Sequence, residues 1–380
     1  MSQTSLRARA CAVFLFSLFL GACGVTQERS ETSDRQQGAL VFPPPPDPPR
    51  FYYERTIFGS ADVVERNDQS EFRTLLTGER ETSDILSKPY AVAVHHGRIF
   101  ATDTVGRGVK VFDIPEARYF VISDTPEGLL GKPLGIDVDG AGRVYVADGT
   151  LKKIMVFDRA GKFVRSIGSE KEFDRLSSVT VNDDGTRVYA VDIGGVQSQN
   201  HRVRVFDGTN GEHLFDIGKR GGGPGEFNLP RDLAVGKDGR LYVVDGGNFR
   251  VQVFDKDGKF IKSFGKVGRQ LGDFARPKEI ASDKAGNVYI ADAAFGNFQV
   301  FDPDGNLLMF VGQRSETNGP GRYMLPSGIF VDEDGRIYMV DQWFKKIDIF
   351  RPAQLKAEEG YLVRRRATAG GEAAAAKVKE

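Results

Sequence analysis

The stretch "LPRDLAVGKDGRLYVVDGGNFRVQVFDKDGKFIKSFG" (229–265) contains four short segments rich in β-branched and aromatic residues. Turn-forming runs such as "GKDG" and "DKDG" separate the segments. The second segment, "LYVV", is apolar on both sides, whereas "VQVF" and "KFIKSF" admit polar residues. This pattern predicts four strands, of which the second is covered on both faces and the last lies farthest from the core.

The same unit recurs along the chain. Residues 132–168 and 276–312 align with it over their whole length, 88–113 and 325–350 contain its first three segments, and 175–218 holds a copy with "QSQNH" (197–201) inserted. The units therefore begin near residues 88, 132, 175, 229, 276 and 325. An Asp closes the second segment of each unit, at Asp103, Asp148, Asp192, Asp245, Asp292 and Asp341. Repeats of four strands that bury their faces by stacking predict an all-β, six-bladed β-propeller with four-stranded antiparallel blades.

The recurring motifs resemble those of NHL repeats. They are a Pro–x–small–apolar start, a "GRxYVAD"-like strand, a "VFDxDGK" strand and connectors such as "GKRGGGPGEFNLP" (218–230). The resemblance covers residues 88–350 and implies a propeller of the kind that serves as a binding surface in some proteins and as an enzyme in others.

The sixth unit stops after its third segment, "IDIF", and would leave the ring with an open sheet edge. The segment 51–59, "FYYERTIFG", has the strand propensity to fill that place and is the predicted closing strand. Two other segments, 71–78 and 360–365, compete for it. We expect a short helix over 353–366, with the rest of 353–380 forming a disordered tail.

The amino terminus resembles a bacterial lipoprotein signal. Arg7 and Arg9 precede the apolar run 11–22, which is too short to span a bilayer, and "LGAC" (20–23) resembles a lipobox. Residues 1–22 are then a signal peptide and Cys23 is lipidated, which predicts attachment to a membrane by acyl chains such as palmitate. Gly24, rather than Asp, resembles the signal for the Gram-negative outer membrane, facing the periplasm. Residues 23–50 are expected to be a tether that ends in a stiff Pro-rich spacer, "FPPPPDPPR" (42–50).

The net charge and the number of cysteines exclude some classes of partner and structure. The chain has 52 basic and 52 acidic residues, and losing Arg7 and Arg9 with the signal leaves 50 against 52, a net charge of −2. That balance argues against a nucleic-acid partner, which demands an excess of cations. Cys11 leaves with the signal and Cys23 would be acylated, so no disulfide is expected. We expect a monomer.

No motif for catalysis, a cofactor or a metal stands out. The D-x-D-G stretches lack the remaining ligands of a calcium loop and are typical of hairpin turns. The four histidines are His95, His96, His201 and His213, and His201 alone lies near the face that carries the connectors. One His does not make a zinc site. The zinc pattern of amidating lyases and the calcium set of lactonase-type propellers are not matched.

Two sets of residues are singled out. The six repeated Asp residues are interpreted as structural, accepting N–H hydrogen bonds in the loop that follows each. Aromatic and cationic residues should rim the connector side of the last blades and form a candidate partner-binding surface: Tyr90, Arg231, Phe249, Arg250, Lys278, Phe295, Trp343 and Phe344. The competing interpretation is that these aromatics are wedged between blades.

The sequence therefore predicts a membrane-anchored, extracytoplasmic binding or scaffold module that presents one propeller face to a protein or polymer. The alternative is a propeller enzyme of lyase or lactonase type with a metal at the central channel. Without a recognisable catalytic set, binding is the favoured hypothesis.

Overall fold

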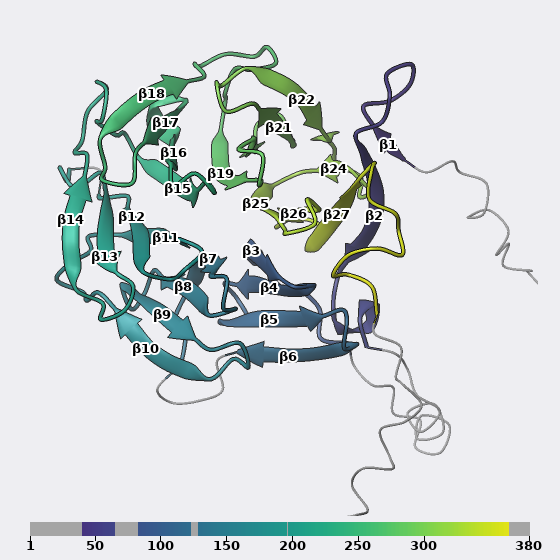
Figure 1. The fold of residues 1–380 in the computed structure, drawn as a ribbon, viewed down its shortest axis with the longest axis horizontal. Helices are drawn as coiled ribbons and strands as arrows, with labels where there is room; N and C mark the ends of the chain where they lie inside the picture. Colours follow the sequence, from purple (N-terminus) through teal and green to yellow (C-terminus); the bar gives the residue numbers. More distant parts are fainter. Residues whose placement is uncertain (1–39, 65–82, 123–127, 196, 365–380) are drawn as a thin grey trace, which may run out of the picture. The chain divides into compact units, whose positions relative to one another are not determined.

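The computed structural model describes residues 40–64, 83–122, 128–195 and 197–364. In this part of the chain, six antiparallel sheets of four or five strands are arranged in a ring (Figure 1), and a cavity, the central channel, lies among their inner strands. The predicted six-bladed, all-β propeller is confirmed. The short 3-10 turns η1 (Ser60–Asp62) and η3 (Gly246–Asn248) lie between strands.

The innermost strand of each blade lines the channel. These strands are β3 (Pro89–His95), β7 (Pro133–Val138), β11 (Leu176–Val181), β15 (Pro230–Val235), β19 (Pro277–Ser282) and β25 (Pro326–Val331). Five begin with proline, which is tolerated at a strand's first position because its missing N–H removes no interior ladder bond.

The second strand of each blade is almost entirely buried. These strands are β4 (Arg98–Asp103), β8 (Val144–Asp148), β12 (Arg187–Asp192), β16 (Leu241–Asp245), β20 (Val288–Asp292) and β26 (Ile337–Asp341). Each ends at one of the six repeated Asp residues. Their apolar runs are buried on both faces because a neighbouring blade covers each side.

Burial decreases toward the rim. The third strands are β5 (Gly108–Asp113), β9 (Lys153–Phe157), β13 (Arg202–Asp207), β17 (Arg250–Phe254), β21 (Asn297–Phe301) and β27 (Lys346–Pro352). The outer strands of the first five blades are β6 (Arg118–Ile122), β10 (Phe163–Ile167), β14 (His213–Ile217), β18 (Phe260–Phe264) and β22 (Leu307–Val311). In β18 and β22 half-buried and exposed residues alternate, as the sequence pattern predicts.

The core is divided among the blade interfaces. Each of the six apolar clusters in the described chain joins two neighbouring blades; one packs Val244 and Val251 of the fourth blade against Ile290 and Phe301 of the fifth. The cluster between the sixth and first blades contains Ile57, Val94 and Val340, so it holds the ring closed where the chain ends meet.

A glycine and an aromatic ring recur at the end of the outer strands. Gly265 follows β18 with a φ of 84°, a conformation that side chains disfavour. A Cβ there would lie 2.2 Å from the ring of Phe274, in the connector that follows. The connector is thereby packed against the blade it leaves, which fixes where β19 begins.

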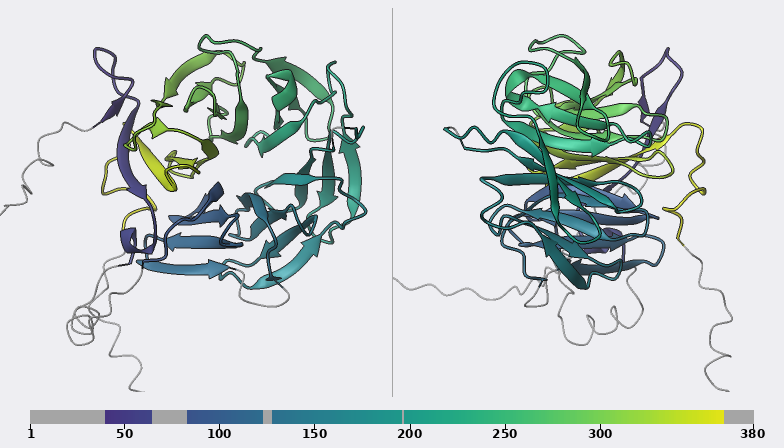
Figure 2. Two further views of the ribbon diagram at one scale, coloured as in Figure 1. Left: turned by 180° about the vertical axis from the view of Figure 1, so that it is seen from behind. Right: turned by 60° about the vertical axis from the view of Figure 1, so that its left-hand side comes forward.

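The amino-terminal segment closes the ring. Strand β2 (Phe51–Ile57) pairs antiparallel with β27 and becomes the fourth strand of the sixth blade, as predicted from 51–59. Figure 1 and the reverse view in Figure 2 both place β2 (purple) beside β27 (yellow). The buried guanidinium of Arg336 joins the seam by hydrogen bonds to Glu54 (2.8 Å), Asp334 (2.9 Å) and the carbonyl of Glu359 (2.8 Å).

Two expectations about the flanks are wrong. Part of the Pro-rich spacer packs on the propeller: β1 (Val41–Phe42) pairs with β2, so the proline run forms the loop of a hairpin. The cause is Phe42, whose ring lies 5.5 Å from that of Phe350. The expected helix over 353–366 is also absent from its described part, 353–364, which forms turns. This segment packs against the sixth blade instead. Leu362 is buried in the cluster between the sixth and first blades, and the Tyr361 backbone N–H donates a hydrogen bond to the Asp334 carboxylate.

Several other predicted features lie outside the described residues: the signal peptide, Cys23, most of the tether, 71–78 and the tail after 364. In the described chain, no helix has both the length and the apolar character needed to cross a bilayer. Strands β23 (Gln313–Arg314) and β24 (Arg322–Tyr323) form a small parallel pair within the last connector.

Candidate functional site: the central channel and its two mouths

The channel opens on two different faces. The connector face carries the links from each outer strand to the next inner strand and the loops between second and third strands. The turn face carries the hairpin turns between first and second strands. Because all inner strands run in the same direction through the ring, equivalent residues of different blades lie at the same depth.

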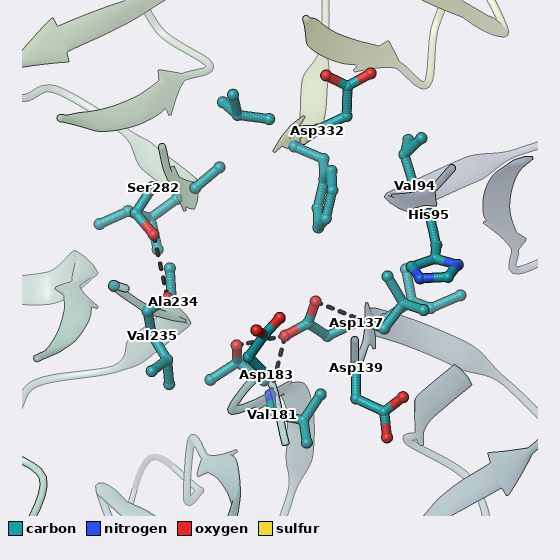
Figure 3. A pocket seen from close by; sticks show the side chains of 18 of the residues that line it. Val94, His95, Asp137, Asp139, Val181, Asp183, Ala234, Val235, Ser282 and Asp332 are labelled. Atoms are coloured by element: carbon teal, nitrogen blue, oxygen red, sulfur yellow. Dashed lines mark hydrogen bonds between the residues drawn. The ribbon is translucent and has the colours of Figure 1, made fainter. Parts of the chain in front are cut away.

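A cavity of about 1030 Å³ occupies the channel and reaches the turn face (Figure 3). Its lining includes Gly135, Ser178, Asp232 and Glu279 from one level of the inner strands, and Asp137, Thr180, Ala234, Ala281 and Phe330 from the next. Each of the second to fifth blades therefore contributes at least one polar side chain to these two levels, whereas the sixth blade contributes Phe330.

Two carboxyl groups lie together deep in the channel. Asp232 accepts hydrogen bonds from the Ser178 hydroxyl (2.5 Å) and the Ile280 N–H (2.8 Å). Burial raises the pKa of Asp232 to about 7, against the partly offsetting effect of these hydrogen bonds. Burial and then repulsion by Asp232 also raise the pKa of Glu279 well above its usual value. Both carboxyl groups therefore keep their protons to higher pH than free carboxyl groups do, a perturbation typical of sites of proton transfer.

A third carboxyl group lies nearer the turn face. Asp137 accepts hydrogen bonds from the Thr180 hydroxyl (2.5 Å) and the Val181 N–H (2.9 Å), both drawn in Figure 3. Burial raises its pKa to about 6. Asp137 holds the second blade to the third in the same way as Asp232 holds the fourth to the fifth.

Cations gather at the connector mouth. Burial lowers the pKa of Arg231, and repulsion by Arg175 and Arg276 adds to the effect. The pKa of Lys278 is lowered by burial first and then by the same neighbours, Arg276 and Arg231. Among the described residues, none of these four side chains has an ion pair or hydrogen bond of its own. Arg231 thus lies within electrostatic reach of Arg175, Arg276 and Lys278, and the Glu279 carboxyl partly opposes the effect of these cations on Lys278.

The predicted surface residues divide into three groups. Arg231 and Trp343 are exposed, the latter by 62%. Phe295, Phe344, Lys278 and Tyr90 are half-buried. Phe249 packs partly against the core between the fourth and fifth blades, which is the competing interpretation for that residue.

Arg250, although predicted on the surface, is committed to the fold. Its guanidinium donates to Asp245 at 2.9 Å and to the carbonyls of Gly223 (2.7 Å) and Glu226 (3.0 Å). It ties the second strand of its blade to the preceding connector and is not free to bind a partner.

The six repeated Asp residues lie at the ends of the second strands and are fully buried. Asp148 accepts N–H hydrogen bonds from Thr150 and Leu151 in the loop that follows it (both 2.9 Å). It also accepts from Gly131 and Lys132 in the connector that precedes its blade. Each Asp thus joins two loops of the connector face and holds them in place.

The histidines lie on different faces of the propeller. His201, at the connector side, is buried and accepts a hydrogen bond from the Leu229 N–H (3.1 Å), so it braces a connector. His95 and His96 lie on the turn face, where burial lowers the pKa of His95. Among the described residues, they form with Glu333 the only group of three metal-type donors, with all ligand atoms within 4.8 Å of one another.

Sequence reasoning missed the channel carboxyl groups and Glu333. A signal for Asp232 and Glu279 was present, since they occupy the second position after Pro in two successive units, where the other three units that begin with Pro have Ala or Gly. For Glu333 no local signal existed, because it looks like any acidic residue of a hairpin turn.

The architecture defines the class of protein as a six-bladed β-propeller. A family model described as "NHL repeat" matches residues 227–254, within the fourth blade. "NHL repeat-containing protein 3" of Mus musculus is 29% identical over 219 residues, covering 52% of this chain and 60% of that protein. The match thus spans less than two thirds of that relative's length.

Solved structures share the fold at low identity. A gluconolactonase from Xanthomonas campestris superimposes with a TM-score of 0.51 at 17% identity, covering 70% of this chain and 86% of that one. A streptogramin B lyase gives a TM-score of 0.52 at 13% identity, covering 70% and 94%. These likenesses show the fold alone. The fourth blade of this six-bladed β-propeller thus carries a recognisable NHL repeat.

Proposed function

We propose that this protein is a binding module whose connector face holds a protein partner rich in carboxylate groups. The observation that carries the proposal is the excess of cations at the connector mouth, where none of the four side chains forms a described ion pair: Arg175, Arg231, Arg276 and Lys278. Like charges held close together repel one another, and an anionic ligand relieves that repulsion on binding. Guanidinium groups match carboxylates with two parallel hydrogen bonds.

Exposed and half-buried aromatic residues on the same face favour a protein over a simple anion. Trp343 is exposed, and Phe344 beside it is half-buried. Trp, Tyr and Arg are the residues that most often anchor protein interfaces. We further propose that the module works in the periplasm, attached through Cys23 to the outer membrane.

The single tryptophan makes the proposal directly testable. Trp343 is the only Trp of the chain and lies on the connector face, so its fluorescence reports binding there. Titration with poly-L-glutamate should change its emission, and the apparent affinity should fall as salt is raised. Replacing Arg231 and Lys278 together with Ala should weaken binding roughly tenfold or more, because each removes a charge-assisted hydrogen-bond donor.

Lys237→Ala is the matched control, since Lys237 is an exposed cation on the turn face. It should leave the titration unchanged. Equal binding by the double variant and this control would contradict the proposal, provided that both unfold at the wild-type denaturant concentration. Trp343→Ala should leave the free energy of unfolding within about 0.5 kcal/mol of wild type.

A second candidate function is catalysis in the channel, favoured by the neighbouring buried carboxyl groups of Asp232 and Glu279, whose pKa values are both raised. Such a pair can donate and accept protons in lyase or lactone-hydrolysis chemistry. Screening the purified protein against lactones, with Asp232→Asn as the comparison, tests this candidate. Activity that is unchanged in the Asn variant would exclude the pair as its acid and base.

A further inference from the structure

The three donors on the turn face come from opposite ends of the propeller sequence. His95 ends β3, His96 lies in the turn after it, and Glu333 lies in the turn between β25 and β26. The first two belong to the first blade and the third to the last blade. Their side chains meet only because the ring closes, at the mouth of the channel cavity.

The Glu333 carboxylate is incompletely satisfied. One oxygen, Oε1, accepts a hydrogen bond from the His96 N–H at 3.3 Å. The other, Oε2, is buried and has no hydrogen-bond partner among the described residues. A buried carboxylate oxygen without a partner is costly, so its retention suggests a ligand that the protein atoms do not supply. The nearby ammonium of Lys284 bonds the main-chain carbonyl of Glu333.

The environment of His95 resembles that of a metal ligand. Its Nε2 lies 3.3 Å from the carbonyl oxygen of Gly140. A carbonyl can only accept, so this contact requires Nε2 to carry the proton and leaves the lone pair on Nδ1. A hydrogen bond from one ring nitrogen to a backbone carbonyl is the usual support of a metal-bound imidazole.

We propose that His95, His96 and Glu333 bind a divalent ion of the zinc class at the turn-face mouth of the channel. Two imidazoles and one carboxylate are a donor set that zinc accepts, with a remaining position for water or a ligand. The cavity borders all three residues, so that position faces the channel.

Binding requires one imidazole to turn. The His95 and His96 rings are stacked with centroids 4.0 Å apart and planes at 28°, and His96 also stacks on Tyr361. Nearly parallel rings cannot aim both lone pairs at one ion. His96 is half-buried and at the edge of the cavity, so its ring is the one that moves.

The ion would act as a clasp on the closing seam. It would connect the first blade to the sixth, where β2 completes the ring. A ligand that binds only the folded state stabilises that state in proportion to the logarithm of its concentration. Zinc should therefore raise the melting temperature in addition to binding with one-to-one stoichiometry.

The test uses full-length protein stripped of metal with a chelator. Calorimetric titration with zinc chloride should give one site, and melting curves should shift upward with added zinc. Glu333→Gln retains an oxygen acceptor for the His96 N–H but loses the anionic ligand, and it should weaken zinc binding roughly tenfold or more. The zinc-dependent shift in melting temperature should shrink in the same variant.

His213→Gln is the control, because His213 lies on the outer strand β14 and bonds Asp216 at 2.7 Å. It should bind zinc as wild type does. His96→Gln provides a second variant of the site, should Glu333→Gln fold poorly. The proposal is overturned if stripped wild type does not bind zinc, or if both site variants bind it as tightly as the control.

Discussion

At the scale of single residues, burial of the channel carboxyl groups makes the stability of the fold depend on pH. The pKa of Asp232 is raised from its usual 3.8 to about 7, so between those pH values the folded state keeps a proton that the unfolded state has released. The sign follows from linkage: stability from this group is fully present below the unfolded pKa and is lost as pH rises through about 7. Asp137, raised to about 6, contributes in the same direction.

We therefore predict that Asp232→Asn becomes increasingly stable relative to wild type as pH rises from about 5 to about 8, with a limiting slope of roughly 1.4 kcal/mol per pH unit. The Asn side chain can accept from the Ile280 N–H and donate to the Ser178 hydroxyl, so the local hydrogen bonds survive. Urea unfolding at several pH values measures the difference. A pH-independent difference would mean that Asp232 is ionised in the folded state throughout.

At the scale of elements, strand β2 carries the closure of the ring. It pairs with β27 over its whole length and buries Ile57 between the sixth and first blades. Deleting residues 51–59 should expose the edge of β27, cost at least about 3 kcal/mol of unfolding free energy and promote oligomers through the free edge. Urea unfolding and size-exclusion chromatography measure the two effects.

Deleting 353–380 is the comparison for this prediction. The segment buries Leu362 and supplies the Glu359 carbonyl to Arg336, but its described residues after 352 contribute no strand. Its loss should lower stability less than the loss of 51–59. The reverse ranking would mean that the C-terminal segment, rather than β2, limits unfolding of the seam.

At the scale of the whole molecule, the open question is attachment. Cys23 is predicted to be lipidated, and each buried CH₂ of an acyl chain contributes about 0.8 kcal/mol to membrane binding. Cys23→Ser should move the protein from the membrane fraction to the soluble fraction of cells that express it, as judged by fractionation and immunoblotting. A variant that still sediments with membranes would show that something other than lipid holds it there.

Much of the fold was predictable because its determinants are local. A few neighbouring residues suffice to predict three features: the strand that ends at Asp245, the Asp-Gly turns and the strand at 51–59. Local patterns failed at the flanks. Phe42 packs against Phe350, which holds the proline run in a hairpin loop. Leu362 packs into the core between the sixth and first blades, which holds the C-terminal segment in turns. Both outcomes depend on partners that are remote in sequence.

The sequence by itself determined the number of blades, the order of strands within them and the strand that closes the ring. These features could be predicted because each blade repeats the same pattern of strands and turns. Only the tertiary structure decided the sites, since Ser178 and Asp232 are 54 positions apart and His96 and Glu333 are 237 apart. A closed ring brings such residues close together in one channel. Burial there shifts the pKa values of the carboxyl groups, and the closure of the ring places the three donor side chains beside one another. No sequence pattern within a single repeat predicts that these residues from different blades lie together.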